Sequence, residues 1–275
     1  AHRIFGFFDI LHLMKTVIIG LAAVAIAFGG WYVWQNNAAQ MKNAEMLAVS
    51  GTLSIRVQES VEYFPGARGY FARPEADGAY PGVVMIHENR GLRPETRMMA
   101  DELAKEGYMV LAVDLVGGTG EPQDDAKKLT ANFKQETGTA NMRAATAYLR
   151  EQGAGKVASL GWCFGGMQSV NLAISGEELD ATVVYYGGGM ATTTEQLTPI
   201  EWPVLGIFGD QDRAIPVETV KTFESSLNTL GIENEIYIYP GVGHAFANPS
   251  GMNYAPEETT DAWAKTVPFL AKHLR

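Results

Sequence analysis

The sequence predicts an α/β protein with a mostly parallel central sheet that helices cover on both faces. Short, uninterrupted apolar runs occur at residues 82–87 (GVVMIH) and 109–113 (MVLAV), and such runs are typical of strands buried on both faces. A segment of helical periodicity at residues 94–106 lies between them. Strand, helix and strand in this order form a parallel unit, because a parallel return needs a crossover connection.

The remaining elements follow in chain order. Residues 54–58, 61–64 and 67–72 read as short strands of an edge hairpin that precedes the parallel unit. The later segments continue the alternation: helix 141–152, strand 157–160, helix 165–175, strand 181–186, strand 204–208, helix 217–230, strand 233–239 and helix 257–273. Ligands of such sheets bind at the carboxyl ends of the strands, so the residues just after each strand are the candidates for function.

Composition limits the classes of function. The chain has 275 residues, 47% of them hydrophobic, which is enough for one large core and predicts a single domain over residues 53–275. A formal net charge of -10 disfavours nucleic-acid binding, which needs clustered Lys and Arg. A single cysteine excludes an intrachain disulfide and a zinc site made of several thiolates.

The N-terminal part of the sequence predicts a membrane segment. Residues 17–34 (VIIGLAAVAIAFGGWYVW) carry no charge and are long enough to cross a bilayer. Met14 and Lys15 resemble the start of a signal-like segment, so residues 1–13 read as an upstream extension. Residues 14–36 then form a signal anchor or signal peptide, and residues 37–52 form a polar linker.

Two alternatives exist for this segment, an uncleaved anchor and a cleaved secretory signal. Trp31, Tyr32 and Trp34 favour the anchor, because bulky aromatic rings suit a membrane interface better than a cleavage site. Basic residues before the run place the N-terminus in the cytoplasm. We therefore expect a domain held at a bacterial-type inner membrane and facing the periplasm, or secreted to the periplasm if the signal is cleaved.

A nucleophile elbow follows the strand at 157–160. Residues 161–166 read GWCFGG and lead directly into a helix, the pattern of a sharp strand-to-helix turn with Cys163 at its centre. Flanking glycines are needed there because the turn leaves no room for Cβ atoms. The backbone amide of Phe164 would face an oxyanion. The alternative, a small buried hydrophobe, is the usual role of a lone cysteine, but it leaves the glycines unexplained.

Two further strands end in loops that carry the partners of a nucleophile. Residues 209–216 (GDQDRAIP) hold two carboxylates, of which Asp212 is predicted to orient the histidine and Asp210 to form a turn. Residues 240–246 (PGVGHAF) present His244 between small residues. The order nucleophile, acid, histidine is that of the α/β-hydrolase fold.

These motifs, together with Glu88 after the strand at 82–87, resemble the dienelactone hydrolase family (carboxymethylenebutenolidases) from about residue 61 to the C-terminus. The resemblance implies that Glu88 contacts the resting thiol and moves when substrate arrives. It also implies that the amides of Asn89 and Phe164 form the oxyanion hole.

The sequence departs from the family at two positions. The arginines that hold a substrate carboxylate in dienelactone hydrolases are replaced here by Gly117-Gly118 and by Asn248. Arg90 offers a substitute cation for substrate binding, or forms a salt bridge with an acid such as Glu95. Trp162 and Tyr186 line the substrate pocket or pack in the core.

The function predicted from these residues is hydrolysis of a small-molecule ester or lactone through an acyl-thioester on Cys163, without a metal or organic cofactor. Membrane contact through the N-terminal helix is expected, nucleic acid is not, and the oligomeric state is open. Two alternatives belong to other classes. One is a binding module on the same fold that does not turn its ligand over, and the other is a thiol redox sensor based on Cys163.

Overall fold

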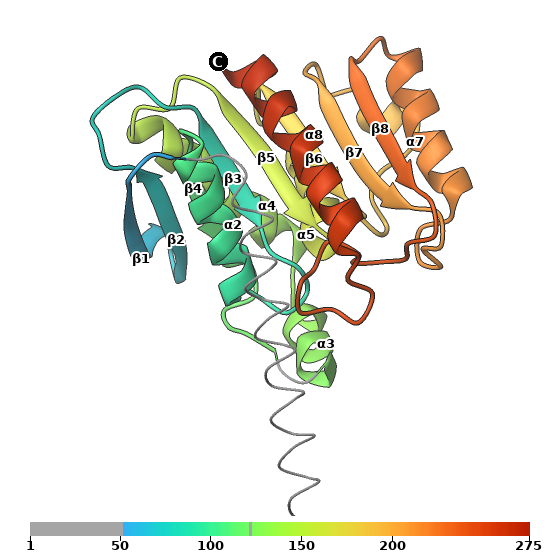
Figure 1. Ribbon diagram of the computed structural model, residues 1–275, viewed down its shortest axis with the longest axis horizontal. Helices are drawn as coiled ribbons and strands as arrows, with labels where there is room; N and C mark the ends of the chain where they lie inside the picture. The colour runs from blue at the N-terminus through green and yellow to red at the C-terminus, as the bar shows by residue number, and fades with distance from the viewer. Residues whose placement is uncertain (1–51, 121–122) are drawn as a thin grey trace, which may run out of the picture. The chain divides into compact units, whose positions relative to one another are not determined.

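The computed structural model describes residues 52–120 and 123–275 and contains one eight-stranded sheet (Figure 1). The strands are β1 (Ile55–Phe64), β2 (Ala67–Pro74), β3 (Gly82–Ile86), β4 (Met109–Val113), β5 (Val157–Trp162), β6 (Ala181–Tyr185), β7 (Val204–Gly209) and β8 (Asn234–Tyr239). Their order across the sheet is β1-β2-β4-β3-β5-β6-β7-β8. β2 pairs antiparallel with both β1 and β4, and every other pairing is parallel. The predicted mostly parallel α/β architecture is therefore confirmed.

Helices lie on both faces of the sheet. They are α2 (Pro94–Lys105), α3 (Gln123–Ala131), α4 (Gln135–Glu151), α5 (Phe164–Ala173), α6 (Thr194–Leu197), α7 (Val217–Thr229) and α8 (Pro256–Leu274). In Figure 1, α2 and α8 cross in front of the strands, whereas α4 and α5 lie behind them. This arrangement explains the uninterrupted apolar runs, because a strand covered on both sides has no polar face.

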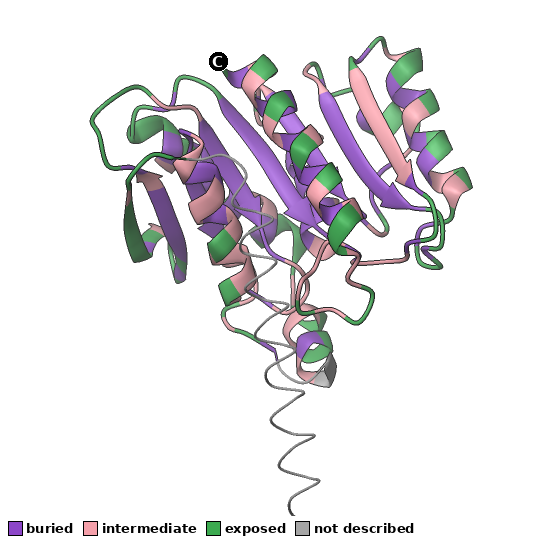
Figure 2. Cartoon of the chain, viewed as in Figure 1, coloured by how far each residue is buried: buried purple, intermediate pink, exposed green. Residues whose placement is uncertain are grey.

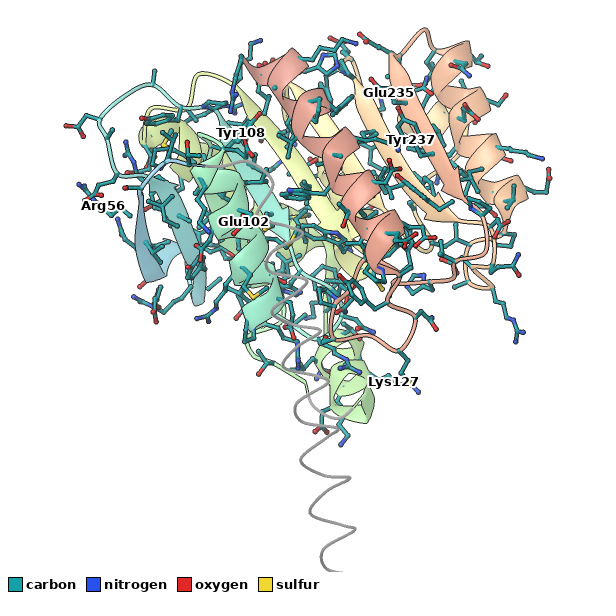
Figure 3. All side chains as sticks on the ribbon, in the orientation of Figure 1. Arg56, Glu102, Tyr108, Lys127, Glu235 and Tyr237 are labelled. Carbon is teal, nitrogen blue, oxygen red and sulfur yellow. The ribbon has the colours of Figure 1, made fainter. Side chains whose placement is uncertain are left out.

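Burial follows the position of each strand in the sheet. All residues of β3, β4, β5, β6 and β7 are buried, whereas β1 is mostly exposed and β8 is only half-buried (Figure 2). The two edge strands thus keep polar side chains. On β8, Tyr237 donates a hydrogen bond to Glu235 (2.9 Å), and the Lys265 ammonium lies 4.9 Å from the Tyr237 ring (Figure 3). A cation above an edge strand disfavours pairing with another chain.

Some predicted boundaries were wrong. The two strands expected at 54–58 and 61–64 form one strand, β1, in which register shifts replace the expected break. The helix expected at 141–152 begins at Gln135, six residues earlier. A glycine near its start, Gly138, weakens the helical pattern in the sequence, and the Phe133 ring packs against it, 2.2 Å from where a Cβ would lie. Helices α3 and α6 were not predicted.

The predictions for residues 1–13, 14–36 and most of 37–52 lie outside the described residues. Within residues 52–120 and 123–275, no helix combines the length and the apolar character needed to cross a bilayer.

The contact between α5 and β3 positions the end of β5. A Cβ on Gly165, in the first turn of α5, would lie 2.2 Å from the carbonyl oxygen of Ile86 and 2.6 Å from that of His87. Real Cβ atoms do not approach backbone that closely. Glycine at this position therefore allows α5 to begin directly against the carboxyl end of β3.

We predict that Gly165→Ala lowers the free energy of unfolding by about 3 kcal/mol, because the new methyl group must displace a buried backbone segment. Chemical denaturation monitored by circular dichroism measures this change. Gly155→Ala is the matched control, since a Cβ there meets open space, and its stability should change by less than about 0.5 kcal/mol. Equal stability of the two variants would contradict the close approach of α5 to β3.

Candidate active site

Cys163 lies in the sharp turn between β5 and α5. Its backbone has φ 55° and ψ -115°, a conformation that L side chains rarely adopt. The turn is tight, because a Cβ on Gly161 would lie 2.1 Å from the carbonyl oxygen of Gly165. The structure thus has the elbow geometry that the GWCFGG pattern predicts.

Cys163, His244 and Asp212 form one line of hydrogen bonds, although they come from three separate loops. His244 Nδ1 lies 2.7 Å from Asp212 Oδ2, and His244 Nε2 lies 3.0 Å from Cys163 Sγ. Because a carboxylate only accepts hydrogen bonds, Nδ1 carries a proton, and Nε2 is left to exchange a proton with the Cys163 sulfur. The structure brings together the three residues that the sequence singled out.

The two carboxylates of the 209–216 loop have different surroundings. Asp212 is buried, and its Oδ1 accepts hydrogen bonds from the amides of Ala214 (2.8 Å) and Ile215 (3.1 Å). Asp210 is exposed and accepts from the Gly241 amide (2.7 Å). Asp212 is therefore held rigidly toward His244, whereas Asp210 joins two turns.

His244 is poised to take a proton. Burial disfavours the imidazolium, but hydrogen bonds to Asp212 and Cys163, together with their charges, outweigh burial and raise the pKa of His244 to about 10. The ring edge of Tyr186 also packs on His244, with ring centroids 5.4 Å apart. A ring fixed by a carboxylate and an aromatic neighbour keeps Nε2 aimed at the sulfur.

Glu88 lies after β3 in a confined site. Its Oε2 accepts a hydrogen bond from Asn248 Nδ2. The carboxyl group also interacts with the buried hydroxyl of Tyr186. Burial raises the pKa of Glu88 to about 7, although Asn248, His244 and Arg90 partly offset this effect. Its carboxyl group therefore titrates near neutral pH.

The contact implied for Glu88 by family resemblance differs from the contact observed. Resemblance implies a glutamate that touches the resting thiol, but Glu88 bonds to Asn248 while the Cys163 sulfur faces His244. Asn248 is itself oriented, because its Oδ1 accepts from the backbone N–H and the hydroxyl of Ser250, both at 2.9 Å. This leaves the Asn248 N–H groups to face Glu88.

The backbone amides of Asn89 and Phe164 both follow the carboxyl ends of neighbouring strands, β3 and β5. β3 and β5 are neighbours in parallel register, with Ile86 opposite Gly161. Asn89 and Phe164 each follow these paired residues by three positions. As the first residue of α5, Phe164 has a backbone N–H without an acceptor within the helix. The arrangement is suited to binding an oxyanion.

A pocket adjoins these residues and includes the three predicted substrate-binding side chains, Arg90, Trp162 and Tyr186. About 430 Å³ of empty space lies over this lining, part of it open solvent. The other lining residues are Glu88, Gly91, Arg93, Glu95, Thr96, Met99, Ala247, Asn248, Pro249 and Ser250. Glu95 forms its salt bridge with Arg93 (3.3 Å).

His87, directly before Glu88, has a structural role at the site. It is fully buried, its Nδ1 donates to the Glu88 carbonyl oxygen (2.5 Å), and its Nε2 accepts from the Leu115 amide (3.1 Å). Burial lowers the pKa of His87, so the ring stays neutral in this double role. The ring thus connects the loop after β3 with the loop after β4.

Comparison with known proteins decides the family. The model of the dienelactone hydrolase family matches residues 67–274. The chain belongs to the dienelactone hydrolase family.

Members of the family with curated names include a Salmonella typhimurium protein named "Putative carboxymethylenebutenolidase", which is 30% identical over 221 residues and covers 74% of this chain and 82% of its own length. "Protein usf" of Aquifex pyrophilus is 31% identical over 219 residues, covering 75% and 94% of the two chains. Among solved structures, a "Putative Dienelactone Hydrolase" from Klebsiella pneumoniae is 26% identical, with a TM-score of 0.70, and the match covers 80% of this chain and 99% of that one. The fold is thus shared with dienelactone hydrolases.

We predict that Glu88→Gln stabilises the protein more at high pH than at low pH. The pKa of Glu88 is about 7 in the folded chain and 4.5 without its surroundings, so the folded state loses stability as pH rises between these values. Because Gln does not ionise, the variant does not lose this stability as pH rises. The gain in unfolding free energy should be on the order of 2 kcal/mol larger at pH 8 than at pH 5. Urea denaturation at both pH values measures it, and a gain independent of pH would contradict a buried, titrating Glu88.

Proposed function

We propose that this member of the family hydrolyses an ester or lactone with Cys163 as nucleophile, His244 as base and Asp212 as the residue that orients the histidine. The observation that carries the proposal is the line of hydrogen bonds from Sγ through the imidazole to the buried carboxylate, at 3.0 and 2.7 Å. Nucleophile, base and orienter within hydrogen-bond reach are the signature of covalent catalysis.

The chemistry follows from this geometry. Cys163 Sγ passes its proton to His244 Nε2 and attacks the carbonyl carbon, forming a C–S bond and a tetrahedral oxyanion. The amides of Asn89 and Phe164 donate to that oxygen. The carbonyl re-forms as the C–O bond breaks, and His244 returns the proton to the leaving alkoxide. An acyl-thioester remains on Cys163.

Water completes the cycle. His244 removes a proton from a water molecule, which attacks the thioester, and the sulfur leaves as the acid is released. For a lactone, the released product is a single hydroxy acid, because alcohol and acyl group are joined. Each step uses only side chains and backbone amides of the loops that follow the strands of the sheet.

We predict that Cys163→Ala abolishes turnover of p-nitrophenyl acetate and of small lactones, with a loss of at least about 10³-fold in kcat/KM, because the variant lacks the attacking atom. Absorbance of nitrophenolate measures the ester reaction. In the wild type, mass spectrometry of a quenched reaction should show one acetyl group, and this label should be absent from Cys163→Ala.

Thermal unfolding of both proteins is the control, since the Cys163 side chain makes no helix-capping hydrogen bond and its removal should leave the fold intact. Equal activity of wild type and Cys163→Ala would refute the nucleophile. If both were folded and inactive on all esters and lactones, a binding module without turnover would replace the proposal.

From the sequence alone we also propose that residues 14–36 attach the domain to a membrane, through their uncharged run at 17–34. We predict that the full chain sediments with bacterial membranes and resists an alkaline wash, whereas a chain that begins at Asn43 stays in the supernatant. Immunoblots of both fractions measure this. A soluble protein lacking residues 1–36 would identify a cleaved signal instead, and a soluble protein that retains them would refute the segment's role.

A further inference from the structure

The pocket beside Cys163 contains equal numbers of acidic and basic side chains. Arg93 and Glu95 form an ion pair through two nitrogen–oxygen contacts of 3.3 Å. Burial alone would raise the pKa of Glu95, but Arg93 outweighs it and holds that pKa below its ordinary value, so the pair is ionised. The other two charged residues, Glu88 and Arg90, interact electrostatically. Above pH 7, where Glu88 is ionised as well, the pocket therefore offsets its own charges, and the assays below are made at pH 8.

Asn248 is the uncharged residue of the pocket lining that contacts Glu88. Its side chain is neutral, and its orientation is fixed by two hydrogen bonds from Ser250. Its Nδ2 donates to Glu88, so an anion entering the pocket would compete with Glu88 for this donor. The same anion would compete with the two pocket carboxylates for the positive charge of Arg90 and Arg93. Both carboxylates would also repel it. Met99, Trp162 and Pro249 supply apolar surface to the lining of the same pocket.

We propose that the substrate of this site is an uncharged ester or lactone, and that Asn248 is the residue that sets this specificity by leaving the pocket without a surplus cation. The inference rests on the proposed hydrolase function. An uncharged group fills apolar surface without breaking any existing ion pair. A carboxylate loses its hydration and gains no unshared cation in return.

Pairs of esters with the same shape test the proposal. The full-length protein is assayed with the p-nitrophenyl esters of 4-isopropylphenylacetic acid and 4-carboxyphenylacetic acid, whose substituents are nearly isosteric. A second pair of esters, acetates of phenols that carry the same two substituents, tests the leaving group instead of the acyl group. A third pair, with 4-tert-butyl and 4-trimethylammonio substituents, tests a positive charge. In each pair, kcat/KM of the neutral ester should exceed that of the charged ester by about tenfold or more.

Three variants assign the effect to Asn248. Asn248→Arg adds a cation to the pocket. It should lower the ratio of kcat/KM for the isopropyl ester to kcat/KM for the carboxylate ester by about tenfold. Asn248→Met removes the hydrogen bond to Glu88 without adding charge, and should leave this ratio within about twofold of wild type. Gln152→Arg adds the same charge at the exposed end of α4, before β5, and should also leave it unchanged.

The outcomes separate the two proposals. If wild type cleaves the carboxylate ester as fast as its neutral partner in either series, the specificity inference fails while the hydrolase function stands. If Asn248→Arg is folded and leaves the ratio unchanged, the assignment to Asn248 fails. If wild type cleaves none of the esters, the proposed function fails, and the specificity inference fails with it.

Discussion

The site depends on the absence of side chains where α5 meets the ends of β3 and β5. Gly161 faces the Gly165 carbonyl and Gly165 faces the backbone of Ile86 and His87, each at a separation that a Cβ atom would make impossible. Only this close packing lets the chain turn sharply at Cys163 and start a helix at once. The sulfur then stands at the carboxyl edge of the sheet, and the first amide of the helix stands beside it.

The loop after β3 is tied to the loop after β4, which gives Glu88 a fixed position. His87 bonds both the Glu88 carbonyl and the Leu115 amide. Gly91 pairs with Thr119, and a Cβ on Gly91 would lie 1.8 Å from the Gly118 carbonyl oxygen. A side chain at Gly91 would therefore separate the two loops. Gly117 and Gly118, which occupy the place of a family arginine, leave room for a Cβ and are not required by this packing.

The loops around the site hold strained backbone. The three non-glycine residues with positive φ among the described residues are Cys163, Tyr186 and Ala245, and all three lie in these loops. Such strain costs stability, and it persists because the fully buried central strands fix the surrounding backbone.

The sequence by itself determined the class of sheet, the order of the elements and three of the loops that carry the chemistry. It could do so because apolar runs, helical periodicity and glycine spacing are local consequences of burial and of sharp turns. The N-terminal boundary of α4 was wrong because Gly138, whose helix propensity is low, weakens the helical pattern in the first turns of the helix.

Only the tertiary structure decided which partners those loops meet. Cys163 and His244 are 81 residues apart, and Glu88 and Asn248 are 160 apart, so no local pattern pairs them. The neutral role of His87 and the balance of charge in the pocket depend on burial and distance. These quantities exist only once the parallel strands bring their carboxyl ends to one edge.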